Sequence, residues 1–490
     1  MSVSAPPRPT AKTQTTTESP VLGDQPLRRP DTRSAQVMTR RAWWLVAMNF
    51  LVPGSAQTLS GNRRLGRFGL AATLTLWTLV VLAAVAALVW PGLLITLGTN
   101  VVFLLVAQIL LLAYAVLWVV LTVDTLRLVR LVKTRPGARP AVAVAAIVGL
   151  VLGSGGAAYA AQQLLAPARE AIAAIFGNSG PSVPPSNGYY NFLLLGADSG
   201  LGRDSMRFDS ISVVSVNAET GAVHITGIPR DLAHVPFSEG PMHDLYPDGL
   251  QGYVSATCGW GPGINQLMNA VEICRDGGGT DLYPDAAANG STPAIEATKD
   301  AAEGILGIEI PYYVFVDMKG FADIVDALGG VDITVQERLP EGGGPAYDGQ
   351  PVEDWATGWI EVGAQHMDGD TAQWYARSRY TTSDWDRMRR QRELQEAILA
   401  QANPANVLTR FQQVAAAGED LVQTDIPASL LPFLVELAAK AKEQPVQTLE
   451  LTPDGAGIDT DEPSAEAYAH VRELIQQALY PPSPTPTPEG

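Results

Sequence analysis

The sequence predicts an α/β sandwich with a central sheet, preceded by N-terminal transmembrane helices. Three observations support this fold class. Long uncharged apolar runs occupy much of the first 162 residues, strand-like and helix-like segments are mixed after residue 189, and the charge balance changes sign between these two parts. A chain of 490 residues is long enough for more than one folding unit.

Three apolar runs predict membrane spans, at about residues 68–90, 99–122 and 140–161. Each is close to the ~20 residues that a helix needs to cross ~30 Å of hydrocarbon, and none contains a charge. The alternative, buried helices of a large soluble core, is disfavoured. Residues 42–59 are apolar as well, but Pro53-Gly54 interrupts them and arginines flank both ends, so we expect a re-entrant or interfacial segment in a membrane region that spans residues 41–162.

Basic residues predict the orientation. Three arginines precede the first span and five Lys or Arg separate the second from the third, whereas the linker between the first two has none. By the positive-inside rule the N-terminus is cytoplasmic, and everything after about Gln162 is extracytoplasmic. Residues 163–490 hold 18 Lys and Arg against 46 Asp and Glu, so we expect no nucleic-acid partner for them.

Composition sets the remaining boundaries. Residues 1–40 and 480–490 are rich in Pro, Ser and Thr and are predicted to be disordered. Residues 163–188 read as a stalk and linker, and residues 189–479 as the extracytoplasmic catalytic domain.

The elements of this domain follow from local patterns. An apolar run from Tyr189 ends at Gly196-Ala197-Asp198, and Ser210–Val216, a turn and Ala222–Ile228 read as a hairpin. Helices are predicted at Ile264–Ala270 and Thr292–Leu306. The later predictions are the strand "IPYYVFVDM", the helix "KGFADIVDALGG", the strand "VDITVQERL", a helix ending near Ala376, a long helix from Asp384, and two or three helices with the strand "VQTLELTP" between Ala405 and Leu479.

Both cysteines, Cys258 and Cys274, lie in the part predicted to be extracytoplasmic. A disulfide between them suits an oxidising compartment, and two free thiols are the alternative. Five scattered histidines and two cysteines do not provide a zinc-type ligand cluster.

Six arginines gather between Tyr375 and Arg392 in a chain of net charge −17. On a helix from Asp384, three polar side chains share the side that continues as Leu394 and Ile398; they are Arg387, Arg390 and Gln391. The opposite side holds Arg389, Arg392, Glu393 and Glu396 and reads as a solvated face. An inward guanidinium needs a partner, which is either a buried carboxylate or an anionic ligand.

Two further arginines strengthen the anion hypothesis. Arg377 and Arg379 stand two apart in an apparently extended segment, which would place them on one side of it. Several arginines converging at the start of a helix favour a phosphate or pyrophosphate site.

Carboxylates are available for a metal ion. Asp198 ends one predicted strand, and Asp209 begins the next, two residues after Arg207. Arg230 and Asp231 follow the second strand of the hairpin. Two Asp side chains together with phosphate oxygens and waters suit Mg²⁺.

These segments resemble the LytR–CpsA–Psr domain. The strings "NFLLLGADSG", "RFDSISVVSVNAETGAVHITGIPRDL", "GINQLMNA", "GIEIPYYVFVDMKGFADIVDALGGVDITV" and "VGAQHMDGDTAQWYARSRYTTSDWDRMRRQRE" are similar to its sequence blocks in the same order. The resemblance covers about residues 189–400 and extends loosely to residue 479.

The resemblance implies an α-β-α sandwich with a mixed sheet and a membrane-anchored phosphotransferase. Such an enzyme moves a glycopolymer from a polyprenyl-pyrophosphate carrier in the lipid bilayer to a peptidoglycan or other cell-wall hydroxyl, forms a phosphodiester and releases polyprenyl phosphate. Two alternatives remain open: a polyprenyl-pyrophosphate hydrolase, and a non-catalytic carrier-binding regulator of envelope assembly.

The resemblance also implies roles for residues. Asp198 and Asp209 match the metal ligands, for Mg²⁺ or Mn²⁺, and Arg230, Asp384 and Arg387 match catalytic positions. The expected pyrophosphate-binding residues are Arg207, Arg230, Arg377, Arg379, Arg387, Arg390 and Gln391. Asp384 is either a general base or a residue that orients Arg387. The chain departs from the family at Gly263 and Arg392, where Lys and Gln are common, and in the insertion at residues 237–300.

Overall fold

The computed structural model describes residues 27–176, 180–197, 207–342, 344–347, 349–378, 380–401 and 422–481. The chain divides into two compact units. The helical unit comprises residues 1–91 and 105–166, and the globular unit comprises residues 92–104 and 167–490.

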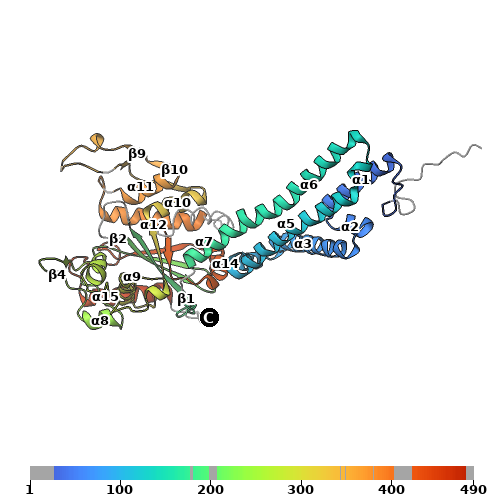
Figure 1. Ribbon diagram of the computed structural model, residues 1–490. Helices are drawn as coiled ribbons and strands as arrows, with labels where there is room; N and C mark the ends of the chain where they lie inside the picture. Colours follow the sequence, from blue (N-terminus) through green and yellow to red (C-terminus); the bar gives the residue numbers. More distant parts are fainter. Residues whose placement is uncertain are drawn as a thin grey trace, which may run out of the picture. The chain divides into compact units, whose positions relative to one another are not determined.

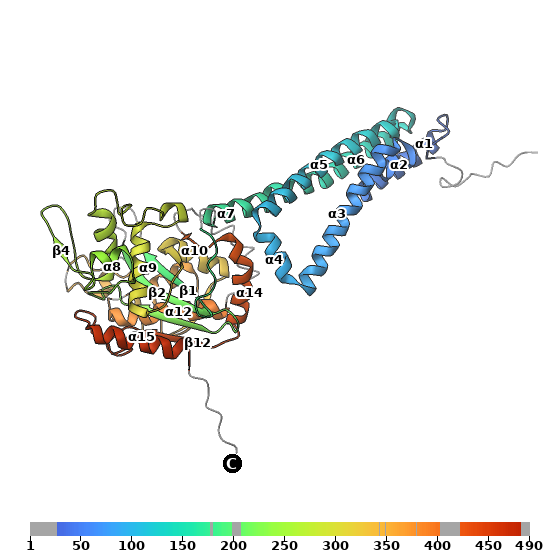
Figure 2. The ribbon, with the colours of Figure 1, turned by 90° about the horizontal axis from the view of Figure 1, so that it is seen from below.

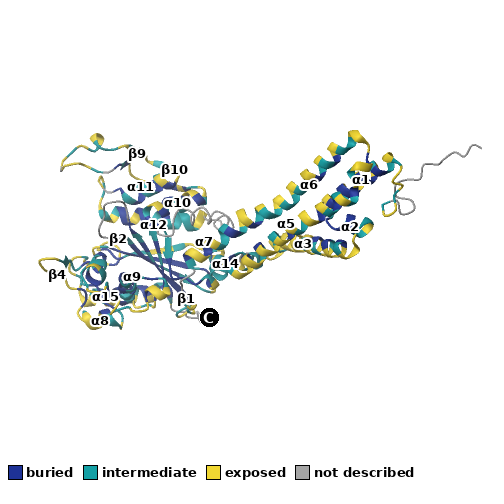
Figure 3. Ribbon diagram, viewed as in Figure 1, coloured by how far each residue is buried: buried dark blue, intermediate teal, exposed yellow. Residues whose placement is uncertain are grey.

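The first part of the chain is helical. Its helices are α1 (Ala35–Leu51), α2 (Ser55–Ser60), α3 (Arg63–Val89), α4 (Pro91–Thr99), α5 (Val101–Val129) and α6 (Arg139–Tyr159). Among the described residues, three stretches are long and apolar enough to cross a membrane: Arg63–Val89, Val101–Lys133 and Pro136–Phe176. Much of the surface of these helices is exposed (Figure 3). The three spans predicted from the sequence are thereby confirmed as apolar helices of sufficient length.

Helix α1 corrects the boundary predicted for the disordered N-terminus. It begins at Ala35, inside the segment 1–40, because the side chain of Ser34 caps it by accepting from the backbone N–H of Val37. The interruption at Pro53-Gly54 is confirmed, since α1 ends at Leu51 and α2 begins at Ser55. That this segment is re-entrant or interfacial stays a prediction, and residues 1–26 lie outside the described chain.

The globular unit is built on a six-stranded mixed sheet of order β11-β6-β1-β2-β3-β12. Its strands are β1 (Tyr189–Ala197), β2 (Phe208–Asn217), β3 (Val223–Ile228), β6 (Tyr312–Asp317), β11 (Val422–Thr424) and β12 (Val446–Glu450). β2 is antiparallel to both β1 and β3, whereas β1 pairs with β6 and β3 with β12 in parallel. The predicted hairpin and mixed sheet are confirmed.

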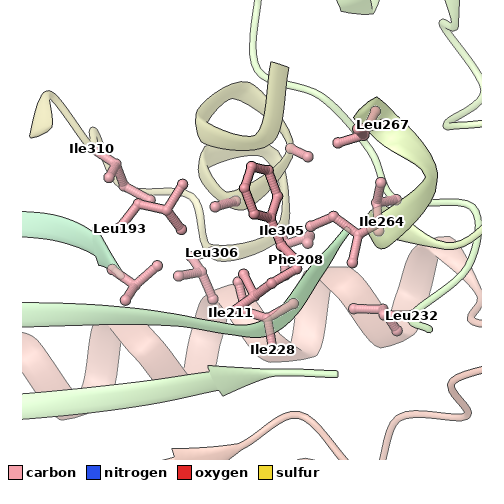
Figure 4. Packing of buried hydrophobic residues seen from close by; sticks show 14 of the residues in the cluster. Leu193, Phe208, Ile211, Ile228, Leu232, Ile264, Leu267, Ile305, Leu306 and Ile310 are labelled. Atoms are coloured by element: carbon pink, nitrogen blue, oxygen red, sulfur yellow. The ribbon is translucent and has the colours of Figure 1, made fainter. Parts of the chain in front are cut away.

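Helices cover both faces of this sheet, as Figures 1 and 2 show. One face packs against α8 (Pro241–Leu245), α9 (Pro293–Leu306) and α15 (Ala465–Leu479). The other layer contains α10 (Met318–Leu328), α11 (Gly369–Arg377), α12 (Asp384–Gln401) and α14 (Leu431–Ala441). Figure 4 shows the core of the first face, where Leu193, Ile211 and Ile228 of the sheet meet Ile305 and Leu306 of α9.

Short strands lie outside the main sheet. β7 (Val331–Val335) pairs with β10 (Gly363–Met367), β8 (Leu339–Glu341) with β9 (Gly358–Ile360), and β4 (Tyr253–Val254) with β5 (Gly259–Trp260). The strand predicted after α10 is therefore present, but it belongs to a separate ribbon. The helix predicted at Ile264–Ala270 is replaced by a 3₁₀ turn at Ile264–Gln266 and a π turn at Asn269–Ile273.

The stalk and the insertion complete the unit. Helix α7 (Ala166–Phe176) occupies the first part of the predicted stalk and linker. In the insertion, Cys258 and Cys274 are joined, with Cα atoms 5.7 Å apart.

Candidate active site

Strand register brings Asp209 and Arg230 together. β2 and β3 are antiparallel with Ile211 opposite Ile228, so the continuation of this register places Asp209, at the start of β2, opposite Arg230, just after β3. Helix α12 contacts β3 and begins at Asp384. Three elements far apart in the sequence thus deliver charged side chains to one end of the sheet.

The guanidinium of Arg230 lies among three carboxylates. Its Nη1 is 2.5 Å from Asp209 Oδ1, its Nε is 3.4 Å from Asp231 Oδ2, and its Nη2 is 3.8 Å from Asp384 Oδ1. Asp384 also contacts Arg387, whose Nη2 lies 3.1 Å from Asp384 Oδ2. Asp384 therefore bridges two arginines, and we call Asp209, Arg230, Asp231, Asp384 and Arg387 the Arg–Asp cluster.

The carboxylates of the cluster determine the electrostatics of Arg230. Burial lowers the pKa of Arg230, but its hydrogen bond with Asp209 and the charges of all three carboxylates outweigh burial, so its pKa is raised. Its side chain is 20% exposed and that of Arg387 is 6% exposed. Two positive and three negative side chains give the cluster a formal charge of −1. A pyrophosphate that approaches it gains from a divalent cation that offsets the carboxylates.

The residue types around Asp209 fit such a cation. Carboxylate oxygens are the ligands that Mg²⁺ takes from proteins, usually one or two of them. Asp209 is 27% exposed, and the residue before it, Phe208, pairs with Ala197, the last residue before Asp198. Asp198 itself lies outside the described residues. Within the described chain no group of three His, Cys, Asp or Glu side chains gathers as a metal site. The pair Asp198 and Asp209 stays a prediction.

Arg390 and Gln391 face inward, as predicted, but their partners are protein atoms. Arg390 donates from Nε to the Tyr375 carbonyl at 3.0 Å, and also to the Ser378 carbonyl and to Thr382 Oγ1. Gln391 Nε2 donates to the Ala376 carbonyl at 3.3 Å. These bonds hold the end of α11 and the segment that follows it against α12. Direct contact of the two side chains with pyrophosphate stays a prediction.

Arg392 corrects the predicted solvated face of α12. Its side chain is 5% exposed and pairs with Glu450 of β12 at 2.9 Å between Nε and Oε1. The prediction assumed that only one side of α12 packs against the protein. In the structure α12 packs on one side against the main sheet and on another against α11 and β7. Arg389 does lie on the solvated face, where it is 50% exposed and 3.0 Å from Asp386.

The remaining predicted arginines have different positions. Arg207 is exposed immediately before β2. Arg377 is the last residue of α11, and its guanidinium carbon lies 5.3 Å from the centre of the Trp374 ring. The extended segment predicted for Arg377 is therefore wrong, because the helix continues one residue past Ala376. Arg379 lies outside the described residues.

Sequence reasoning missed two supporting residues. Asn265 donates from Nδ2 to Asp231 Oδ1 at 2.9 Å and from its backbone N–H to the Arg230 carbonyl at 3.0 Å. The string "GIN" pointed to Asn265 but gave it no role. Glu450, the partner of Arg392, is an acidic residue in a short predicted strand, and this position alone gave only a weak indication of an ion pair.

Comparison with known proteins identifies the domain. Residues 283–477 match the sequence model of the LytR_cpsA_psr family. This match places residues 283–477 of the globular unit in the LytR–CpsA–Psr family. The Arg–Asp cluster combines side chains from inside the matched range and from before it.

Relatives of this chain include a named transferase and a named regulatory protein. The chain is 28% identical over 238 residues to the polyisoprenyl-teichoic acid–peptidoglycan teichoic acid transferase TagU of Bacillus cereus, covering 48% of the chain and 60% of TagU. It is 26% identical over 289 residues to biofilm regulatory protein A of Streptococcus mutans, covering 57% and 61%. The chain thus spans about 60% of the length of these relatives.

Solved structures of similar proteins include TagV of Bacillus subtilis, with 22% identity and a TM-score of 0.38 over 59% of this chain and 97% of TagV. Another is protein gbs0355 of Streptococcus agalactiae, with 20% identity and a TM-score of 0.41 over 60% and 88%.

Proposed function

We propose that the chain is a membrane-anchored phosphotransferase. It moves a glycopolymer from a polyprenyl-pyrophosphate carrier to a hydroxyl of peptidoglycan or another wall polymer. The observation that carries this proposal is the Arg–Asp cluster, in which two half-buried or buried arginines and Asp209 meet at one end of the sheet. The names of TagU and TagV, both teichoic acid transferases to peptidoglycan, support the substrate class.

The proposed reaction is a single displacement at phosphorus. The acceptor hydroxyl oxygen attacks the polymer-side phosphorus and forms a new P–O bond. The bond from that phosphorus to the bridging oxygen breaks, and polyprenyl phosphate leaves with the electron pair. The hydroxyl proton passes to solvent or to a nearby base. Catalysis of this kind depends on positioning and on stabilising charge on the non-bridging oxygens, which suits Arg230 and Arg387.

A divalent cation, Mg²⁺ or Mn²⁺, is part of the proposal. Asp198 and Asp209 would hold it, and when bound it would neutralise charge on the pyrophosphate. The partly exposed carboxylate of Asp209 supports a cation there, because carboxylate oxygens are ligands that Mg²⁺ takes from proteins.

We propose an orienting role for Asp384. It contacts Arg230 and Arg387 at the same time, so it fixes the directions in which both guanidinium groups present their other N–H groups. Both contacts use the carboxylate oxygens of Asp384, Oδ1 toward Arg230 and Oδ2 toward Arg387, which suits an orienting role.

The proposal also places the domain outside the cell membrane. The basic residues around the spans support a cytoplasmic N-terminus, in a multi-pass arrangement with the catalytic domain extracytoplasmic. We propose that the Cys258–Cys274 bond forms there, because an extracytoplasmic compartment permits disulfides.

The test uses the purified full-length chain in detergent. It is mixed with a synthetic polyprenyl-pyrophosphate oligosaccharide, peptidoglycan fragments and Mg²⁺, and both polyprenyl phosphate and joined sugar–peptidoglycan product are quantified. We expect the two products in equal amounts, and loss of both in Arg230→Ala. Release without joining would indicate a hydrolase, and donor binding without release would indicate a carrier-binding regulator.

A further inference from the structure

The insertion that follows the Arg–Asp cluster presents an exposed aromatic pair. Tyr253 of β4 and Trp260 of β5 lie with ring centres 4.8 Å apart and planes 33° apart. Tyr253 is 51% exposed, and its neighbour Val254 is 87% exposed. Trp260 packs its inner side against the main core and donates from Nε1 to the Gln251 carbonyl at 3.0 Å. The pair therefore presents an aromatic face to solvent from a fixed base.

The hairpin that carries the pair is held in shape by local bonds. The Ser255 backbone N–H and Oγ both donate to the Cys258 carbonyl, at 2.7 and 2.8 Å, and the Cys258 N–H donates to Ser255 Oγ at 3.0 Å. Cys258 is also joined to Cys274. A rigid aromatic surface loses little conformational entropy when a ligand binds, so it is suited to recognition.

This hairpin is connected directly to the Arg–Asp cluster. Backbone N–H groups of Asn265, Ile264 and His234 donate to the carbonyls of Arg230, Leu232 and Pro262 at 3.0, 3.0 and 3.1 Å. The segment after Trp260 thus runs back along the segment after Arg230. Asn265 lies five positions after Trp260, a span of at most about 17 Å at ~3.3 Å per residue. An oligosaccharide of a few units can bridge that distance.

The charge pattern selects the class of ligand. Residues 249–263 contain no charged side chain, although residues 163–490 are strongly acidic. Neutral amides lie on the same segments: Gln251 Nε2 donates to the Gly249 carbonyl, Gln266 Nε2 to Asn265 Oδ1, and Asn269 Nδ2 to the carbonyl of Gly259, the neighbour of Trp260. Aromatic rings beside amide donors and acceptors match the C–H faces and hydroxyl or acetamido groups of a neutral sugar. An anionic membrane surface is disfavoured because the hairpin offers it no Lys or Arg.

We propose that Tyr253 and Trp260 form a subsite for neutral sugar units of a wall glycan, on the acceptor side of the reaction. This subsite deepens the proposed transfer function and rests on it for its place in the reaction. Its role is to hold the acceptor glycan while a hydroxyl of that glycan reaches the phosphorus at the Arg–Asp cluster.

The first test measures binding without catalysis. Chitotetraose, an N-acetylglucosamine oligomer without phosphate, is titrated onto the full-length chain in detergent and followed by saturation-transfer NMR. Tyr253→Ala is the test variant, because this exposed side chain can be removed with little effect on folding. Tyr253→Phe keeps the ring and is the matched control. We expect wild type and Tyr253→Phe to bind equally and Tyr253→Ala to bind about tenfold more weakly.

Two binding outcomes would overturn the subsite. The first is the same chitotetraose affinity in Tyr253→Ala as in wild type, or no affinity in either. The second is a loss in Tyr253→Ala of binding to phosphatidylcholine or phosphatidylglycerol vesicles alone, which would make the hairpin a membrane contact.

Steady-state kinetics distinguish failure of the subsite proposal from failure of the proposed function. In the transfer assay, Tyr253→Ala should raise KM for a long glycan acceptor about tenfold and leave kcat within twofold. Transfer that is unaffected by Tyr253→Ala would reject the subsite and leave the function intact. Tyr253-dependent sugar binding in a wild-type chain that transfers nothing would reject the function and retain the subsite as a glycan-binding site.

Discussion

At the scale of single residues, three arginines of α12 have three different tasks. Arg387 contacts Asp384 in the Arg–Asp cluster, Arg390 holds the end of α11, and Arg392 pairs with Glu450 beneath the helix. Helical periodicity predicted the inward direction of the first two. It failed for Arg392, because periodicity gives the angle of a side chain around the helix but not the number of sides that neighbours cover.

The Arg392–Glu450 pair predicts a strong effect on stability. Burial raises the pKa of Glu450 despite its contact with Arg392, and Glu450 Oε2 has no hydrogen-bond partner among the described residues. Arg392→Met leaves this carboxylate buried without a cation, so we expect a loss of about 3 kcal/mol in the free energy of unfolding. Thermal unfolding of the purified full-length chain measures it.

The double variant Arg392→Met with Glu450→Leu should regain most of that loss, since no buried charge remains. Arg389→Met on the exposed side of the same helix is the matched control and should change stability by no more than about 0.5 kcal/mol. Equal destabilisation by the single and double variants would show that packing, and not the ion pair, determines the effect.

Asp384→Asn separates the two roles considered for Asp384. An orienting carboxylate replaced by an amide keeps its shape and loses charge, so we expect kcat to fall about tenfold with the shape of the pH–rate profile unchanged. Steady-state transfer rates between pH 5 and 9 provide the measurement. A loss of about 1,000-fold together with disappearance of the low-pH limb of the profile, where a general base becomes protonated, would identify Asp384 as the general base.

At the scale of elements, Asp300 of α9 is a partly buried acidic group that contacts the earlier part of the insertion. Tyr283 donates a short hydrogen bond to Asp300, and the Ser238 N–H donates to the Asp300 carbonyl at 2.9 Å. Burial is the main cause that raises the pKa of Asp300 to about 6, and the negative charges of Glu303 and Glu296 raise it further. The hydrogen bond from Tyr283 and the positive charge of Lys299 lower it, but by less. Tyr283 is therefore attached to α9 through a carboxyl group whose protonated form is favoured.

The sign of the resulting pH dependence follows directly. Because the folded chain binds this proton more tightly than the unfolded chain, Asp300 stabilises the fold below about pH 4 relative to higher pH. Its contribution declines by about 3 kcal/mol as pH rises through about 6, at ~1.4 kcal/mol per pKa unit. Asp300→Asn should remove this decline, which unfolding curves at pH 4, 5, 6 and 7 can resolve. Parallel pH curves for wild type and Asp300→Asn would contradict it.

The helices and strands also show which structural features sequence patterns can predict and which they cannot. The β2–β3 hairpin and the start of α12 were predictable because turn residues, β-branched runs and helix periodicity are local signals. The departure of β7 into a ribbon with β10 was not, since a short apolar strand looks the same in either sheet. The contact of Arg230 with Asp384 was likewise hidden, because 154 positions separate the two residues and tertiary packing alone joins them.

At the scale of the whole molecule, charge and hydrophobicity divide the chain. The three apolar spans precede a domain whose charged groups would act on an anionic lipid-linked substrate, so the proposed chemistry requires that domain on the outer side. This requirement is independent of the geometry of the Arg–Asp cluster.

Reporter fusions test this placement. A fusion after Gln162 to alkaline phosphatase, which is active outside the cytoplasm, should be active, and the same fusion to a cytoplasmic reporter should be silent. Fusions in the linker between the second and third spans, near Arg135, should give the reverse result. Activity of the cytoplasmic reporter alone after Gln162 would contradict the proposed topology and the reaction with it.

The most direct test of the central claim compares Arg387→Ala with Arg389→Ala in the full-length chain. Both substitutions remove an arginine from α12, but the first side chain is 6% exposed in the Arg–Asp cluster and the second is 50% exposed outside it. Formation of the phosphodiester-linked product is measured with a polyprenyl-pyrophosphate oligosaccharide and peptidoglycan fragments. The account predicts a loss of about 100-fold or more for Arg387→Ala and a change within twofold for Arg389→Ala. Equal rates for a folded Arg387→Ala and wild type would contradict the assignment of the active site.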